Sequence, residues 1–312
     1  MVSDAKANFT TRSFLPKMEA QRRDLIRRFP KSMLWHTDGG WFAPDEYWGN
    51  LDWLTYLYEE SPLKERIVTC NSMGFGCCKT YPGSSKCWEY GDAPSGGDRT
   101  TAGSVVPHFY TNQMTIEQGS WGWDRSEGLS QMLGTVDLVR ELTQVRAPTL
   151  ASVPRFASWS VTSLGSLAQT TAWNGTLIVN VGPTADGRLA PIFEERLGEL
   201  GAWLSSNGAA IFGTRPWAGA LPSGGEAGGG KEVYYTCKGG TVFAITLAWP
   251  DTGVLNLELP VPGAGATAKL LATGATIAWT GGPAGRGMGL KLGAAPPLGS
   301  RWAWAIQLDG LS

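Results

Sequence analysis

The sequence predicts an α/β fold with parallel strands, followed by a smaller antiparallel β domain. Three observations support this prediction. Helical and strand patterns alternate up to about residue 213, the strands are short apolar runs that end in polar turns, and shorter period-two runs follow. Such alternation is typical of a parallel α/β barrel or of an open doubly wound sheet. We place the domains at residues 1–213 and 214–312.

The first part of the chain alternates two helices with two strands. Apolar residues recur at helical spacing over residues 14–29 and again over residues 45–60. Met33–Trp35 and Ile67–Thr69 are short apolar runs of the kind found in buried strands. The first of these strands runs into a glycine turn that contains Asp38. Polar residues at the ends of such strands often carry chemistry.

The same alternation continues through the middle of the chain. Met114–Ile116 predicts a strand, residues 126–144 a helix, and Leu177–Val181 another buried strand. A further helix is predicted to begin at Pro191, because proline is favoured in the first turn of a helix. These elements extend the predicted α/β domain.

Beyond residue 214 the pattern changes to that of an antiparallel β-sandwich. Residues 223–230 are rich in glycine and predict a loop. Period-two runs separated by Gly and Pro turns predict strands at residues 233–235, 242–246, 254–259, 269–271, 288–292 and 302–306. Several short strands of this kind favour a small sandwich.

The amino-acid composition argues against some classes of binding partner and favours another. Lys and Arg number 26 against 27 Asp and Glu, a net charge of −1, so no general field attracts nucleic acid or an anionic membrane. No apolar run is long enough to span a bilayer. The 15 Trp residues favour a carbohydrate ligand, since indole rings stack on the apolar faces of sugars, although Trp also fills cores.

Cysteines and histidines give no pattern typical of a metal site. Four of the five Cys lie within residues 70–87, without a Cys-x-x-Cys pair, and the histidines His36 and His108 lie outside that segment. We therefore expect no metal and no cofactor. A disulfide-linked loop is the alternative, and Asn8 and Asn174 begin glycosylation sequons. The first residues lack the apolar core of a signal peptide, so either the protein is cytosolic or its start is missing.

Four segments together resemble the α-L-fucosidases of glycoside hydrolase family 29. They are LWHTDGGWFAPDEYW (34–48), PHFYTNQMTIEQGSWGW (107–123), the long block that starts LIVNVGPTADGR (177–217) and VLNLELP (254–260). The resemblance implies a (β/α)8 TIM-like barrel, a C-terminal β-sandwich and retaining hydrolysis of terminal α-L-fucose from glycoconjugates. It also implies a fucosylated glycan or glycoprotein as substrate and a lysosomal or secreted location.

The resemblance assigns roles to three residues. Asp38 matches the family nucleophile, while Trp41 and Trp121 match positions that shape the sugar pocket. Retaining hydrolysis uses two carboxyl groups about 5 to 5.5 Å apart, one as the nucleophile and the other as the acid/base. On composition alone, an Asp before two glycines is a turn residue.

The sequence departs from the family pattern at two further positions. Thr111 stands at the family's acid/base Glu, and a Thr hydroxyl is no general acid near neutral pH. Ser72 stands at the family's substrate-binding Arg. Glu89 is the substitute acid that we would test, with a solvated loop carboxylate as the alternative. Glu117 matches a position that is acidic in the family, and we expect a structural role for it.

The resemblance also implies a partial barrel that lacks its N-terminal units, because the family nucleophile follows the fourth barrel strand. We expect either a partial gene product or a chain completed by an N-terminal half, and a homo-oligomer is also possible. Residues 145–169 form an atypical insertion, either a translated intron or a surface loop. The rival to a hydrolase with impaired turnover is a noncatalytic fucose-binding or other carbohydrate-binding scaffold.

Overall fold

The computed structural model describes residues 11–37, 45–69, 95–98, 102, 104–107, 109–117, 120–125, 167–228, 231–298 and 302–312. The chain forms two compact units. The first comprises Met1–Ser95 with His108–Thr111, and the second Gly96–Pro107 with Asn112–Ser312. Within the described ranges, every helix is too short or too polar to cross a membrane. The domain boundary between residues 213 and 214 stays a prediction.

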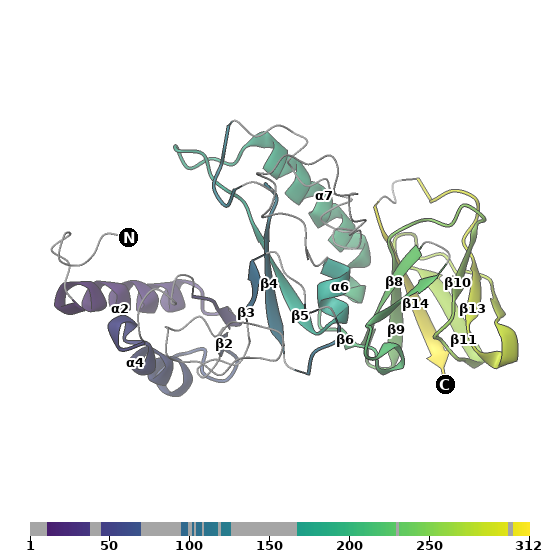
Figure 1. The fold of residues 1–312 in the computed structure, drawn as a ribbon, viewed down its shortest axis with the longest axis horizontal. Coiled ribbons are helices and arrows are strands. Elements are labelled where there is room, and N and C mark those ends of the chain that lie inside the picture. Colours follow the sequence, from purple (N-terminus) through teal and green to yellow (C-terminus); the bar gives the residue numbers. More distant parts are fainter. Residues whose placement is uncertain are drawn as a thin grey trace, which may run out of the picture. The chain divides into compact units, whose positions relative to one another are not determined.

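The first unit follows the predicted alternation of helix and strand (Figure 1). Its elements are α2 (Thr11–Arg28), β1 (Leu34–Trp35), α3 (Asp45–Trp48), α4 (Asn50–Thr55), the π-helical turn η2 (Tyr56–Glu60) and β2 (Val68–Thr69). β1 and β2 pair in parallel, as the fold class requires. The predicted helix over residues 45–60 is interrupted at Gly49, whose φ of 60° lies in the left-handed region that glycine adopts easily.

A small apolar core holds α2 against α4 and η2. Ile26, Trp53 and Leu57 are buried in it. Arg22 is buried beside them, and its Nη2 donates to Asn50 Oδ1 at 3.1 Å while its guanidinium lies over the Trp53 ring. Burial lowers the pKa of Arg22, since it disfavours the charged form. These contacts compensate part of the cost of burying the cation.

Next along the chain is a three-stranded sheet of order β3-β4-β5, most of which belongs to the second unit. Its first elements are β3 (Ser95–Asp98), β4 (Tyr110–Thr115), α6 (Leu167–Ala172), β5 (Gly175–Asn180), α7 (Pro191–Asn207) and the 3-10 turn η4 (Gly208–Ala210). Met114, Ile116 and Phe193 are buried in one cluster, so α7 covers this sheet with its apolar face. The predicted helix over 126–144 and most of the predicted insertion lie outside the described residues.

Asn174, the second glycosylation sequon, lies between α6 and β5 with a φ of 76°. Its Nδ2, the atom to which a glycan would be attached, donates to the carbonyl of Val106 at 3.2 Å. Glycosylation of this asparagine stays a prediction, and Asn8 lies outside the described residues.

The C-terminal part of the second unit contains two antiparallel sheets. The elements are β6 (Arg215–Pro216), η5 (Ala218–Ala220), β7 (Gly225–Gly228), β8 (Lys231–Lys238), β9 (Thr241–Thr246), β10 (Val254–Leu257), β11 (Pro262–Leu270), β12 (Trp279–Gly281), η6 (Pro283–Gly285), β13 (Met288–Lys291) and β14 (Trp304–Leu311). One sheet has the order β11-β14-β9-β8-β6, with β7 paired to β8, and the other the order β10-β13-β12. Side chains of both sheets share one core, which confirms the predicted antiparallel region.

The larger sheet is buried on both faces. In β9, Val242 and Ala244 belong to the core shared with the smaller sheet, whereas Phe243 and Ile245 belong to a second core with helices α6 and α7. α6 contacts both β5 and β8, so it links this sheet to the preceding α/β part of the same unit (Figure 1). Burial on both faces explains why β9 is almost continuously apolar instead of alternating.

Trp203 of α7 is the anchor of this second core. It is 3% exposed, and its Nε1 donates to the carbonyl of Ala303 at 2.9 Å. We expect Trp203→Ala to lower the free energy of unfolding by about 3–5 kcal/mol, since large buried aromatic side chains leave a cavity. Urea unfolding measures this loss, with fully exposed Leu298→Ala as the control. A loss below about 1 kcal/mol would mean that α7 does not depend on this contact.

The predicted loop over residues 223–230 is wrong in part, because β7 forms there and pairs with β8. Glu226 explains how a glycine-rich segment holds a strand. Its carboxylate accepts the Tyr235 hydroxyl at 2.6 Å and the backbone N–H groups of Glu258 and Leu259 at 3.0 Å. This cross-sheet anchor is a tertiary interaction that composition does not reveal.

The buried Tyr235 hydroxyl makes the stability of the folded protein depend on pH in the alkaline range. Burial first, and then the charge of Glu226, raise the pKa of Tyr235 well above its ordinary value of 10.0. The unfolded chain therefore loses this proton at a lower pH than the folded chain, and stability falls as pH rises above about 10. We expect Tyr235→Phe to show a smaller loss of stability between pH 9 and 11. Equal pH slopes of the two proteins, measured by urea unfolding, would contradict this expectation.

Candidate functional site

Two strand ends of the first unit lie at one edge, because β1 and β2 are parallel. The chain leaves β1 through His36 and Thr37, both half-buried, and Asp38 is the next residue. At the end of β2, Thr69 is buried and shares a hydrogen bond of 2.8 Å with the hydroxyl of Tyr58. Four predicted site residues lie outside the described residues: Asp38, Trp41, Ser72 and Glu89.

Thr111 lies inside β4 and is fully buried. Its hydroxyl has no hydrogen-bond partner among the described residues. Burying a hydroxyl without a partner normally costs free energy. Thr111 is therefore held in place by the pairing of its strand and not by hydrogen bonds of its side chain. Its ordinary pKa is far too high for it to donate a proton to a leaving group.

Glu117, two residues beyond the end of β4, holds the only carboxylate that the described residues bury completely. Both of its oxygens accept the backbone N–H of Asp124, at 3.2 and 3.3 Å. These bonds close the loop between the two residues, which is a structural role of the kind that the sequence predicts.

Asn180 ends the neighbouring strand β5 and holds the same loop from the other side. Its Nδ2 donates to Thr115 Oγ1 at 3.1 Å and to the carbonyl of Trp121 at 2.8 Å. A Cβ on Gly182 would lie 2.3 Å from the backbone of Gly122, so only glycine allows this close approach. The ends of β4 and β5 thus form one fixed polar surface.

Two tryptophans in this loop have different environments. Trp123 packs edge-on against Phe193, with ring centroids 5.5 Å apart, and so anchors the loop on α7. Trp121 is 40% exposed. An exposed indole supplies an apolar face of the kind on which a sugar ring can stack. Of the predicted site residues, the structure therefore describes Trp121 and Thr111, and it adds Glu117.

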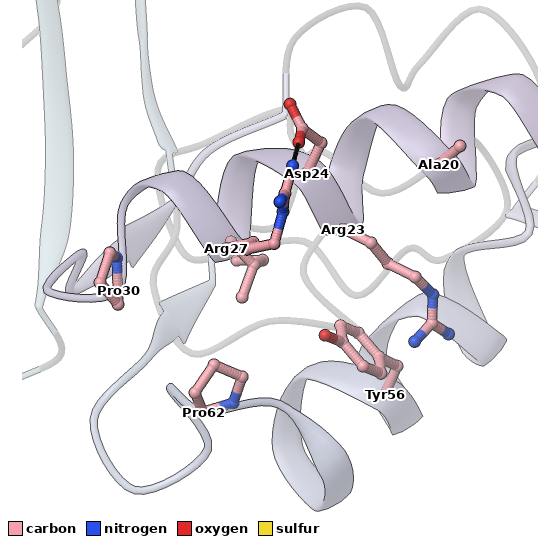
Figure 2. Close-up of a pocket in the computed structure, with 8 residues that line it drawn as sticks. Ala20, Arg23, Asp24, Arg27, Pro30, Tyr56 and Pro62 are labelled. Atoms are coloured by element: carbon pink, nitrogen blue, oxygen red, sulfur yellow. Dashed lines mark hydrogen bonds and ion pairs between the residues drawn. The ribbon is translucent and has the colours of Figure 1, made fainter.

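A separate cavity of about 620 Å³ lies between α2 and η2 in the first unit (Figure 2). Arg23 lies over the Tyr56 ring, with its guanidinium carbon 3.7 Å from the ring centroid. Hydrogen bonds from Arg27 and Arg28 lower the pKa of Asp24. Arg27 pairs with Asp24, and Arg23 pairs with Glu19 on the same helix, so the charged groups of this cavity already have partners. They come from a helix and not from strand ends.

No group of three or more His, Cys, Asp or Glu side chains within the described ranges is arranged to hold a metal ion. Cys237 is a free thiol, and the other four cysteines lie outside those ranges. The described strand ends therefore offer carboxyl, amide and indole groups for chemistry. In α/β proteins, groups that follow the strands are commonly the ones that bind or transform a ligand.

Comparison with known proteins defines the family. The Alpha-L-fucosidase family model matches residues 1–148 and 160–209, and the Alpha-L-fucosidase C-terminal domain model matches residues 229–309. The chain therefore belongs to the α-L-fucosidase family. It is 32% identical to an alpha-L-fucosidase of Branchiostoma floridae, over 99% of this chain and 61% of that protein. It is 31% identical to the tissue alpha-L-fucosidase of Bos taurus, over 99% of this chain and 58% of that protein.

Solved structures show the same fold. An alpha-fucosidase of Thermotoga maritima superimposes with a TM-score of 0.64 at 20% identity, covering 93% of this chain and 55% of the other. Alpha-L-fucosidase isoenzyme 1 of Paenibacillus thiaminolyticus gives 0.65 at 20% identity, covering 96% and 62%. The mixed α/β part and the antiparallel sheets are thus those of family 29. The chain spans about three-fifths of the length of the relatives it matches.

Proposed function

We propose that this chain is a retaining α-L-fucosidase that removes terminal α-L-fucose from glycans or glycoproteins. Membership of the family over residues 1–148 and 160–209 carries this proposal. The motif over residues 34–48 supports it further, since it begins in β1 and continues past the end of that strand, where barrel enzymes place catalytic groups. No cofactor enters the proposed reaction, because the two half-reactions need only carboxyl groups and water.

Asp38 is the proposed nucleophile, which attacks the anomeric carbon and forms a fucosyl-enzyme ester. Trp41 and Trp121 are the proposed pocket residues, and partial exposure of Trp121 supports its assignment. Ser72 replaces the family's Arg and removes a charged hydrogen-bond donor from the substrate. Weaker binding of fucose is the consequence.

The proton donor is proposed to be Glu117 in preference to Glu89. The position of Glu117 two residues beyond the end of β4 supports this choice, because barrel enzymes place catalytic groups just after their strands. Its two bonds to the Asp124 N–H hold the carboxyl group in place. Thr111, buried and unpartnered, supports the reading that the family's usual donor has been lost from its own position.

The described α/β part is proposed to be an incomplete (β/α)8 barrel, with the sandwich domain over residues 214–312. Within the described residues, β1 pairs only with β2, and its other edge is open. Leu25, Phe29 and Met33 are 46, 58 and 69% exposed, which is unusual for three neighbouring large apolar side chains. We therefore propose that a further polypeptide, either an N-terminal half or a second copy, covers this surface, and that turnover by the chain alone is impaired.

Mixing this chain with a second polypeptide tests whether that polypeptide completes the barrel. The part of the Branchiostoma floridae relative that this chain does not span is expected to form a complex with the chain and to raise its melting temperature. Leu25→Asp with Phe29→Asp is expected to abolish that complex. A monomer that unfolds cooperatively and binds nothing would contradict completion by either partner.

The relatives named tissue and plasma alpha-L-fucosidase support a lysosomal or secreted location for this chain as well. The proposed activity is tested with an aryl α-L-fucoside, whose good leaving group departs without a general acid. We expect a burst of aryl release and an intact-mass increase of one fucosyl group. Fucose binding without release or adduct would favour the noncatalytic carbohydrate-binding scaffold, the second candidate, which the buried Thr111 supports.

A further inference from the structure

The outer face of the small sheet β10-β13-β12 carries a row of polar residues. Leu257 and Met288 point into the core, so their neighbours along the strands face outward. Asn256, Gly289 and Thr280 are aligned in this outward row, since Gly289 pairs with Asn256 on one side and with Thr280 on the other. The three strands thus present two polar side chains with a glycine between them.

Gly289 makes this row concave. A Cβ at this position would lie 2.9 Å from Thr280 Oγ1 and 3.4 Å from Asn256 Oδ1. Gly289 also lines a cavity of about 500 Å³, with Leu259 and Pro283 among its apolar lining. A cavity of this size accommodates a small ligand. We call the cavity the outer-sheet cradle and define it by Asn256, Glu258, Arg286 and Gly289.

The polar side chains of the cradle have free hydrogen-bonding groups. Arg286 Nε donates to the carbonyl of Glu258 at 3.3 Å, which places the guanidinium at the rim. Its Nη groups, the Glu258 carboxylate and the Asn256 amide have no hydrogen-bond partner within the described part of the chain. One positive and one negative group cancel in charge, so the cradle favours a neutral ligand over an anion or a cation.

We propose that the outer-sheet cradle binds a neutral pyranose residue of a glycan. Sugar hydroxyls both donate and accept, which matches the Arg286 donors, the Glu258 acceptors and the Asn256 amide. The C–H face of the ring would contact the apolar lining. This site uses none of the residues proposed for hydrolysis, and it would hold a glycan on the sandwich while leaving Asp38 unaffected.

Saturation-transfer NMR on the full chain tests the proposal, with methyl β-D-galactopyranoside and methyl β-D-glucopyranoside as probes. Neither probe is a fucoside, so the proposed hydrolytic site contributes little. We expect transfer to at least one probe, reduced about fivefold in Arg286→Ala and in Asn256→Ala, because each variant removes a hydrogen bond. Asp38→Ala is expected to keep the full signal, which separates this site from the proposed hydrolase.

Lys291→Ala is the matched control, because Lys291 is exposed on the same strand outside the cradle. Gly289→Val places a branched side chain between Asn256 and Thr280 and is expected to abolish transfer, and its unfolding curve shows whether the fold is kept despite the close approach to Thr280. Absence of transfer from a cooperatively folded chain, or transfer that persists in Arg286→Ala, would overturn the proposal. Displacement of the sugar by equimolar inorganic phosphate would identify an anion site of Arg286 and overturn it too.

Discussion

Replacement of Asp38 by alanine is expected to abolish the fucosyl adduct and to slow aryl release from an activated α-L-fucoside about 10³-fold or more. The expectation follows from the proposed covalent step, because no other group attacks the anomeric carbon once the nucleophile is removed. Single-turnover release and intact mass, recorded on the same sample, measure both effects. Asp38→Asn tests the same step with a nearly unchanged side-chain shape.

Two controls separate lost chemistry from lost structure. Asp52→Ala removes an exposed carboxylate of α4 and is expected to keep both the burst and the adduct. Unfolding curves of the Asp38 variants should match that of the parent chain, since Asp38 follows a strand end. An adduct that survives in Asp38→Ala would assign the nucleophile to another carboxylate.

Much of the first unit could be predicted because its elements are local. The apolar spacing that forms α2 is a property of eighteen consecutive residues, and the parallel pairing of β1 with β2 follows from the intervening helical segment. The π-helical turn η2 could not be predicted, since it replaces the last turn of an ordinary helix without any change in the apolar pattern.

The C-terminal part shows where sequence patterns stop being informative. Strand β7 depends on the Glu226 carboxylate, whose partners Tyr235 and Glu258 are 9 and 32 residues away. The second core depends on Trp203, whose partner Ala303 is 100 residues away. Contacts between residues so far apart in the sequence produce no periodic pattern. The glycine-rich strand β7 therefore reads as a loop from sequence alone. For the same reason, the sequence does not show that the sheet containing β9 is buried on both faces.

The candidate site was predictable only as a set of residue types. Glu117 has an acidic side chain at a strand end, which was visible in the sequence. Its complete burial and its two bonds to Asp124 were not, because they arise when the loop folds back over Asn180. The relevant signal was the turn-forming Gly122 and Gly182, whose close approach closes the loop. Glu117, for which the sequence predicts a structural role, is therefore our preferred candidate for the acid.

The variant Glu117→Gln distinguishes a structural role from that of a general acid, when its rates are compared on substrates with poor and good leaving groups. If Glu117 donates the proton, the variant should lose about 10²- to 10⁴-fold in rate on an alkyl α-L-fucoside, whose alkoxide leaves poorly. On a dinitrophenyl α-L-fucoside the first step should change less than about tenfold, because that leaving group needs no proton. The glutamine amide oxygen still accepts the Asp124 N–H, so the loop is expected to fold.

If Glu117 has only a structural role, the result is different. The substitution would then distort the loop and lower the rates on both substrates by a similar factor. The pH profile adds an independent readout: parent activity on the alkyl fucoside should fall on the alkaline side as the acid loses its proton, and Glu117→Gln should lack that limb. Glu89→Gln is the matched control, and it should leave the ratio of the two rates unchanged. If Glu89→Gln alone produces the leaving-group dependence, the proton donor is Glu89, and Glu117 serves only to hold the loop at the end of β4.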